Sequence, residues 1–507
     1  MLFRSTWNKL TGGLPAGILG RIGVAISRQD PNTVFTIVEN ANQNGVDLDT
    51  QKKKFADGFG TVGGGEAQLF RSDDAGKTWR QVAPAPVTAA APAGGRGAAA
   101  PAAGGRGGGF DGGSPCYYYG QVRIDPNDKE HIFILSVGAT QSRDGGRTWT
   151  GLGAGGDNHA LWIDPKDSQH MLLGYDHGMT VTFDGGAHWY HPDNLPLAQA
   201  YAVGYDMATP YNVYTGLQDN GSIKGPSTRR GGGNIPYEDW STVGGGDGQY
   251  NVVDWKDSRY LYNESQFGAI QRTDMWTGQS KNIAYRGAAG KEPLRYNWTA
   301  PILVSPHDAD TIYFAGNVVL KSTTRGDAWE EISPDLTVND PAKRNGGGNI
   351  TYATITSLDE STIAPGLLWV GTDDGNVQVT RDGGRTWTNV RDKITGNPGY
   401  WVSRVEASHQ NPGTAYVTVT GLRNDDFRPF IWKTTDYGAT WTSLAGNLPK
   451  EAINVVREDP RNADLLFVGT DLHVYVSMDG GKAWTQLKGA VAGAPAGFGR
   501  EIGRAHV

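Results

Sequence analysis

The chain has one cysteine, Cys116, among its 507 residues. A single cysteine excludes an intrachain disulfide framework. The sequence also lacks any run of about 20 apolar residues, so we expect no membrane insertion. Its formal net charge is −7, with acidic and basic residues interspersed, which argues against nucleic acid as a partner. Fixed metal-ligand spacings are missing too, so we expect no metal and no cofactor.

One motif recurs along the whole chain, a box of the form Ser/Thr-x-Asp-x-Gly-x-Thr-Trp. This spread indicates a structural repeat, because a catalytic site needs its special residues only once. The glycine permits a left-handed turn, the Asp and Ser/Thr side chains bond nearby N–H groups, and the Trp buries apolar surface. We therefore interpret the box aspartates as structural. The seven copies are Ser72–Trp79, Ser142–Trp149, Thr182–Trp189, Ser322–Trp329, Thr380–Trp387, Thr434–Trp441 and Ser477–Trp484.

Short apolar strands precede most boxes and form units of similar length. In one unit, Gln121–Ile124 is followed by the turn Asp125–Pro126 and by the apolar run His131–Leu135. Such runs separated by turn residues predict four-stranded antiparallel sheets. About nine units occur, so we predict an all-β fold, a β-propeller of four-stranded blades whose outer hairpins are the boxes. Because one ring usually has four to eight blades, nine units predict an unusually large ring or parts of two.

Two segments fall outside these units. Residues 83–113 consist mainly of Ala, Pro, Gly and Arg, a composition that predicts a disordered insert. We also predict a disordered tail over residues 491–507, of which 501–507 match the translation of a common sequencing adapter and are left out of the fold prediction. From the partial units at its ends, we expect the chain to be a fragment.

The boxes resemble the Asp-box (bacterial neuraminidase, BNR) repeats of sialidases, xyloglucanases and sortilin ectodomains. Gly156–Pro165, Gly216–Gly221, Val243–Gly248 and Val370–Val377 resemble large bacterial secreted proteins described as sortilin-like or glycosyl-hydrolase-like. The resemblance implies two seven-bladed rings, with residues 1–197 as the last three blades of the first and residues 198–490 as six blades of the second. A single large sortilin-like ring is the alternative. The resemblance also implies an extracellular or periplasmic protein, although the sequence given contains no signal peptide.

Ligands of a propeller bind at the loops around its central channel, away from the boxes. Carboxylate, amide and aromatic side chains on such loops suit a polyhydroxyl or peptide ligand. We therefore predict a monomer that binds an extended peptide or a glycan, as the sortilin resemblance implies. The predicted ligand-binding residues are Asp157, His159, Asp176, His177, Gln218, Asp247, Glu264, Gln266, Trp298, Asp374 and Asp471.

Glycoside hydrolysis of a polysaccharide is the alternative function. It needs two carboxyl groups, about 5 to 5.5 Å apart for retention or about 6.5 to 9.5 Å for inversion. The resemblance to xyloglucanases implies that these groups come from opposite rings, and by position it makes Asp219 the candidate general acid or base. The second carboxyl group would lie outside this sequence. Asp219 has another interpretation, a loop aspartate that caps a turn, and the sequence leaves open whether the parent protein is an enzyme.

Overall fold

The computed structural model describes residues 9–10, 12–17, 19–40, 66–82, 120–192, 195, 197–231, 235–344 and 350–488. The predicted insert at 83–113 and the predicted tail at 491–507 lie outside these residues. The chain divides into two compact units, one covering residues 1–196 and the other covering nearly all of the rest.

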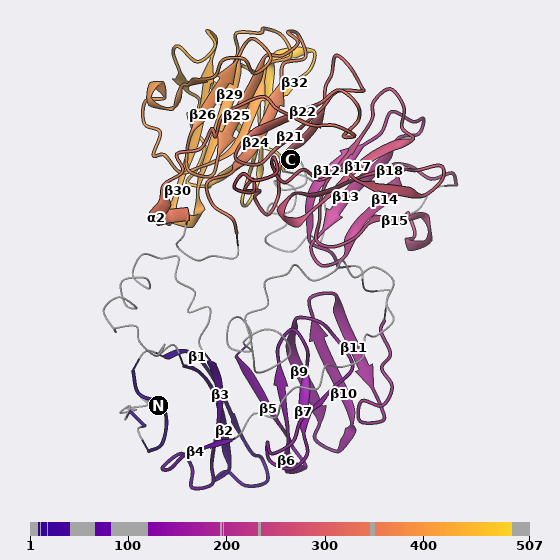
Figure 1. Cartoon of the computed structure of the whole chain (residues 1–507), viewed down its shortest axis with the longest axis vertical. Helices are drawn as coiled ribbons and strands as arrows, with labels where there is room; N and C mark the ends of the chain where they lie inside the picture. The colour runs from indigo at the N-terminus through magenta and orange to yellow at the C-terminus, as the bar shows by residue number, and fades with distance from the viewer. Residues whose placement is uncertain are drawn as a thin grey trace. The chain divides into compact units, whose positions relative to one another are not determined.

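The first unit contains three antiparallel sheets (Figure 1). The first sheet has β1 (Leu19–Ile26), β2 (Val34–Asn40), β3 (Glu66–Ser72) and β4 (Arg80–Val82). The second has β5 (Gln121–Asp125), β6 (Asp128–Leu135), β7 (Thr140–Ser142) and β8 (Thr150–Gly151). The third has β9 (Asn158–Asp164), β10 (Asp167–Tyr175) and β11 (Gly178–Thr182).

The described residues of the second unit form six sheets of four strands each. Its first three sheets are β12 (Ala200–Tyr205), β13 (Asn212–Leu217), β14 (Gly221–Pro226), β15 (Ser241–Gly244); β16 (Gly248–Val253), β17 (Tyr260–Ser265), β18 (Ala269–Asp274), β19 (Gln279–Asn282); and β20 (Ile302–Val304), β21 (Ile312–Ala315), β22 (Val319–Ser322), β23 (Glu330–Glu331). The other three are β24 (Ile355–Glu360), β25 (Leu368–Thr372), β26 (Val377–Thr380), β27 (Thr388–Asn389); β28 (Trp401–Ala407), β29 (Ala415–Gly421), β30 (Asp426–Thr434), β31 (Thr442–Ser443); and β32 (Ile453–Asp459), β33 (Asn462–Thr470), β34 (Val474–Ser477), β35 (Thr485–Gln486).

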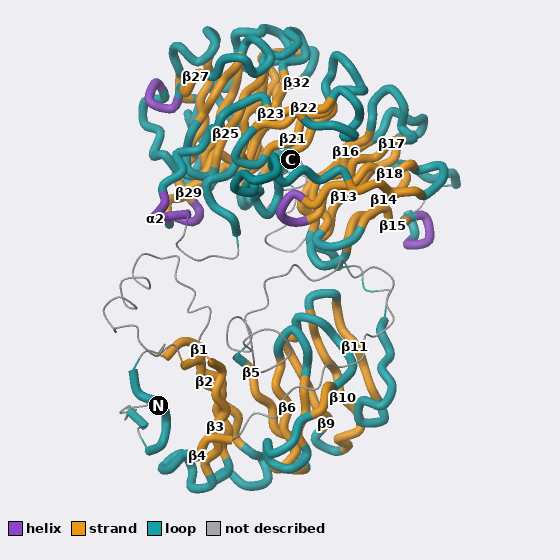
Figure 2. Tube along the Cα trace, viewed as in Figure 1, coloured by secondary structure: helices purple, strands orange, loops and turns teal. Residues whose placement is uncertain are grey.

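Every sheet is a meander in which strands adjacent in sequence are hydrogen-bonded neighbours. The predicted all-β architecture of propeller blades is therefore confirmed, and Figure 2 shows how little of the described chain is helical. Helical segments in that part of the chain are α2 (Pro341–Arg344) and 3₁₀ turns at Tyr237–Asp239, Gln266–Gly268, Arg391–Lys393 and Leu422–Asn424. No helix among the described residues is long and apolar enough to cross a bilayer.

The third sheet departs from the predicted four strands. Among the described residues after its box, the chain pairs back through one bridge, between Val181 and Tyr190, so three strands of this sheet are described. The predicted fourth strand is reduced to this bridge there.

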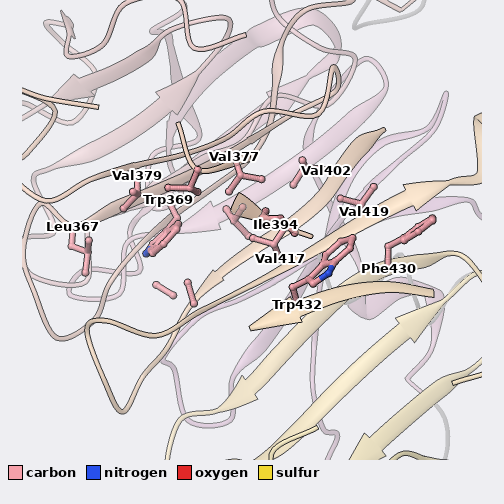
Figure 3. Close-up of a cluster of buried hydrophobic side chains, with 14 residues drawn as sticks. Leu367, Trp369, Val377, Val379, Ile394, Val402, Val417, Val419, Phe430 and Trp432 are labelled. Carbon is pink, nitrogen blue, oxygen red and sulfur yellow. The ribbon is translucent and has the colours of Figure 1, made fainter. Parts of the chain in front are cut away.

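In the second unit, the first strands of successive sheets pack against one another in the order β12, β16, β20, β24, β28, β32. These strands are therefore the innermost ones, arranged about a common axis. Apolar side chains fill the space between neighbouring sheets, as Figure 3 shows for Trp369, Val402, Val417 and Trp432. Every residue of β29 is buried, because a middle strand has a sheet packed on each face.

The boxes form tight turns held by their own side chains. In the box of the eighth sheet, Thr434 donates a hydrogen bond from Oγ1 to Asp436 Oδ1 (2.8 Å), and the N–H of Gly438 donates to Thr434 Oγ1 (2.9 Å). Thr440 donates from its backbone N–H and from Oγ1 to the two Asp436 oxygens, at 2.8 and 2.6 Å. The indole N–H of Trp441 donates to the Gly438 carbonyl (3.1 Å). All these bonds stay within the hairpin, so the aspartate holds the turn.

The box at Ser322–Trp329 has Thr324 in place of the aspartate. The turn is kept, because Thr324 Oγ1 accepts the hydrogen bond from the N–H of Ala328 at 3.0 Å. A hydroxyl group can therefore replace one of the carboxylate contacts, which fits a structural role for this position.

Replacing Asp436 with Asn is expected to remove a contribution to stability that depends on pH. Hydrogen bonds from Thr440 lower the pKa of Asp436 to about 2, against an ordinary value of 3.8. The stabilisation is therefore complete above about pH 4 and is lost as the pH falls through about 2. We expect the thermal midpoint of the variant to lie below that of the wild type at about pH 5, and the gap to close near pH 2. Circular dichroism melts measure this, and a gap that does not change with pH would contradict it.

Candidate functional site

Loops from two adjacent sheets of the second unit bring three of the predicted site residues together. The backbone N–H of Asp219, in the turn after β13, donates to Asp247 Oδ1 at 2.7 Å. Asp247, just before β16, donates from its own N–H to Gln266 Oε1 at 3.0 Å. Asp219 has φ of +60°, a left-handed conformation that a residue other than glycine adopts at some cost. The bond to Asp247 helps to offset that cost, and Asp247 is itself only 7% exposed.

Aromatic side chains extend this cluster. The indole N–H of Trp298 donates to the Tyr201 hydroxyl at 2.9 Å, and that hydroxyl donates to Gln218 Oε1 at 2.7 Å. The ring of Phe267 lies edge-on to Trp298, with centroids 5.0 Å apart. All three aromatic residues are partly exposed. We call Tyr201, Gln218, Asp219, Asp247, Gln266, Phe267 and Trp298 the loop cluster.

The structure thus places the sequence-predicted residues in two hydrogen-bonded groups, one with Asp219, Asp247 and Gln266 and the other with Gln218 and Trp298. The two groups are adjacent along the chain at Gln218 and Asp219. Sequence reasoning missed Tyr201 and Phe267. An aromatic residue at the start of an innermost strand is the only signal that could have pointed to Tyr201. Phe267 lies in a short turn with φ of +58°, and no residue pattern in the sequence predicts this left-handed conformation.

Glu264 lies close to the loop cluster in sequence but inside the second unit. Glu264 is only 1% exposed, and its Oε1 accepts a hydrogen bond from the N–H of Ala300 at 2.6 Å. Burial raises the pKa of Glu264 well above its ordinary value. The carboxyl group therefore supports the segment before β20, and ligand contact by Glu264 stays a prediction.

Asp374 and Asp471 are also buried and hold loops. Asp374 Oδ2 accepts hydrogen bonds from the N–H groups of Val338 (2.8 Å) and Asn339 (3.1 Å). Asp471 Oδ1 accepts one from Asn454 Nδ2 at 2.9 Å. Neither carboxylate belongs to the loop cluster, so for these two residues ligand contact stays a prediction.

Asp373, next to Asp374, is another buried carboxyl group near these loops. Its Oδ2 accepts hydrogen bonds from Thr354 Oγ1 at 2.6 Å and from Asn297 Nδ2 at 3.4 Å. Burial raises the pKa of Asp373 to about 7, against the opposing effect of the Thr354 bonds. The group is almost fully buried, so it ties the loops of two sheets together.

In the first unit, the four predicted residues of the third sheet also lie together. His159 Nε2 is 2.7 Å from Asp176 Oδ1, and the N–H of Asp176 donates to the carbonyl of Asp157 at 3.2 Å. Burial raises the pKa of Asp176, while His159 and His177 act in the opposite direction. Across the described part of the chain, no group of three or more His, Cys, Asp or Glu residues is placed to hold a metal ion. The arrangement therefore supplies polar contacts and one histidine–carboxylate pair.

Comparisons with known proteins point to one kind of relative. Among curated proteins, a xyloglucanase from a Paenibacillus species is 27% identical over 251 residues, which cover 43% of this chain and 23% of that protein. An oligoxyloglucan-reducing end-specific xyloglucanase from Emericella nidulans is 22% identical over 402 residues, which cover 70% of this chain and 44% of that protein. The chain is similar to xyloglucanases. It spans less than half the length of these relatives.

No protein-family model matches the chain. Among solved structures, a GH74 enzyme from Niastella koreensis aligns with 92% of this chain and 71% of that chain, at 14% identity and a TM-score of 0.23.

Proposed function

We propose that the second unit binds a polysaccharide of the xyloglucan type at the loop cluster, and that Asp219 acts in its hydrolysis as a general acid or base. The observation that carries this proposal is the hydrogen-bonded group of Asp219, Asp247 and Gln266 beside Tyr201 and Trp298. The similarity to two xyloglucanases supports a polysaccharide over the peptide ligand that a sortilin-like protein would bind.

The side chains of the loop cluster suit a sugar polymer. Partly exposed aromatic rings offer flat apolar faces for the C–H groups of a sugar ring, and their polar atoms are already fixed by hydrogen bonds. Amide and carboxylate groups beside them can bond sugar hydroxyls. Because the side chains of Tyr201, Gln218 and Trp298 are linked to one another, their geometry is set before a ligand arrives.

Asp219 and Asp247 have different roles in this proposal. Asp247 is nearly buried and uses one carboxylate oxygen to hold the backbone of Asp219, so it is a positioning residue. Asp219 is half-buried on a loop and has a left-handed backbone conformation. We propose that its carboxylate meets a glycosidic oxygen or a water molecule of the bound substrate. Hydrolysis needs a second carboxyl group, and we propose that it comes from outside the loop cluster. A polymeric substrate of this kind also favours an extracellular or periplasmic location.

Replacing Trp298 with Ala tests the binding site. We expect this variant to bind a xyloglucan oligosaccharide at least about tenfold more weakly in calorimetric titrations, a loss of about 1.4 kcal/mol, because the stacking face is removed. Trp276→Ala is the matched control. Trp276 is 79% exposed and follows the C-terminal end of β18, whereas Gln266 and Phe267 of the loop cluster precede the N-terminal end of that strand. Equal binding by both variants, or no binding by the unaltered chain, would refute the proposed site.

A further inference from the structure

Charged side chains from three sheets meet near the axis of the second unit. Arg404 and Glu406 lie on β28, Asp359 on β24 and Arg457 on β32. All three strands are innermost strands, which pack in the order β24, β28, β32. The four side chains therefore lie on successive strands around one axis.

A residue from a more distant sheet completes the group. Burial lowers the pKa of Arg404, the charge of Arg457 lowers it further, and Tyr250, Glu406 and Asp359 oppose these effects. Tyr250 lies on β16, and two sheets separate that strand from the sheet of β28. Tyr250 and Arg404 therefore both lie on innermost strands of the second unit.

Arg404 is the member of this group with two buried polar atoms that lack a hydrogen-bond partner among the described residues. The residue is only 7% exposed, and its Nε and Nη2 atoms have no hydrogen-bond partner in the part of the chain that the structure describes. The acidic neighbours are engaged elsewhere. Glu406 Oε2 accepts a hydrogen bond from Arg457 Nη1, and Asp359 Oδ2 accepts one from the N–H of Ala407 at 2.8 Å.

A buried guanidinium group without hydrogen bonds is unfavourable, because it has lost its water and gained no replacement. Its free atoms also define a shape. The N–H groups on Nε and Nη2 point in parallel from one edge of the planar group, which matches the two oxygens of a carboxylate. A halide ion offers one centre and cannot use both donors with the same geometry.

We propose that the Nε–Nη2 edge of Arg404 binds a carboxylate anion on the axis of the second unit. The charge balance of the site agrees with this. Burial and the neighbouring charge of Glu406 raise the pKa of Asp359, which disfavours the charged form of that carboxyl group. A bound carboxylate would supply negative charge beside the two arginines. The carboxylate can be a small free anion such as acetate or the acid group of a sugar such as glucuronate.

Calorimetric titration of the full chain with sodium acetate, against sodium chloride at equal ionic strength, tests this site. We expect saturable acetate binding by the unaltered chain, and binding at least about tenfold weaker in Arg404→Lys, which lacks the two parallel donors. The matched control is Arg423→Lys. Arg423 is exposed, and its guanidinium group stacks on Trp401 of β28, 4.2 Å from the ring centroid. This control is expected to bind acetate as the unaltered chain does.

A parallel titration with glucuronate shows whether the site prefers a small free carboxylate anion or the acid group of a sugar. Tighter binding than acetate supports a sugar acid, and weaker binding supports a small free anion. The site is overturned if acetate and glucuronate both give the same heats as chloride, or if Arg404→Lys binds acetate unchanged. Line broadening of ¹³C-acetate by the unaltered chain, reversed by excess formate, provides a test that needs no variant. None of these results depends on polysaccharide binding at the loop cluster.

Discussion

In a longer form of the protein that supplies the second carboxyl group, replacing Asp219 with Asn is expected to slow xyloglucan hydrolysis by about 10²–10⁴-fold, the usual contribution of a general acid or base. Asn has nearly the same shape, and the bond to Asp247 comes from the backbone N–H of residue 219, so the loop is expected to keep its conformation. We therefore expect oligosaccharide binding to change by less than about threefold while the turnover number falls. Steady-state kinetics together with calorimetric titration measure both quantities.

Asp247→Asn is the informative companion to this variant. Because Asp247 acts through the backbone of Asp219, its replacement is expected to lower the rate without removing the ionisation of Asp219 from the pH profile. In Asp219→Asn, by contrast, that limb of the profile is expected to disappear. An Asp219→Asn variant with the activity of the wild type would rule out Asp219 as the acid or base.

Replacing Trp369 with Ala is expected to lower the free energy of unfolding by about 3–5 kcal/mol. Trp369 is completely buried between the sheets of β24–β27 and β28–β31 (Figure 3). Its ring lies edge-on to that of Trp441, with centroids 6.0 Å apart. Removing it leaves a cavity that the neighbouring strands, hydrogen-bonded on both sides, cannot close. Urea unfolding followed by fluorescence measures the loss.

Two controls define the physical cause. Trp276→Ala, at an exposed site, is expected to change stability by less than about 0.5 kcal/mol. Trp369→Phe is expected to cost much less than Trp369→Ala, since the buried indole N–H of Trp369 makes no hydrogen bond among the described residues and only packing is lost. A loss below about 1 kcal/mol for Trp369→Ala would show that the packing between these sheets contributes little.

The fold could be predicted because each repeat is stabilised by interactions between residues close together in the sequence. Ser/Thr, Asp, Gly and Trp at fixed spacing form a turn from their own side chains, as Asp436 and Thr440 show, so the pattern needs no distant partner. The fourth strand of the third sheet could not be predicted in this way. Its pairing depends on whether the segment after Trp189 follows β11, and only Tyr190 does so. The assignment of units to seven-bladed rings stays a prediction.

The loop cluster was partly predictable for a related reason. Gln218 lies on the loop after β13, and Asp247 and Trp298 lie on the loops before β16 and β20. In a propeller, loops of these two kinds from successive sheets lie at the same end of the fold. The sequence could not show which side chains turn inward. Glu264 and Gln266 are two residues apart, yet Glu264 is buried and Gln266 receives the bond from Asp247. Arg404 was not predicted at all, because its neighbours come from strands far apart in the sequence.

A crystal structure of the chain with a bound xyloglucan oligosaccharide is the most direct test of the proposed function. Our account predicts a sugar ring stacked on Trp298, with a hydroxyl or glycosidic oxygen within hydrogen-bonding distance of the Asp219 carboxylate. Sugar bound at the box hairpins instead, with the loop cluster empty, would contradict it.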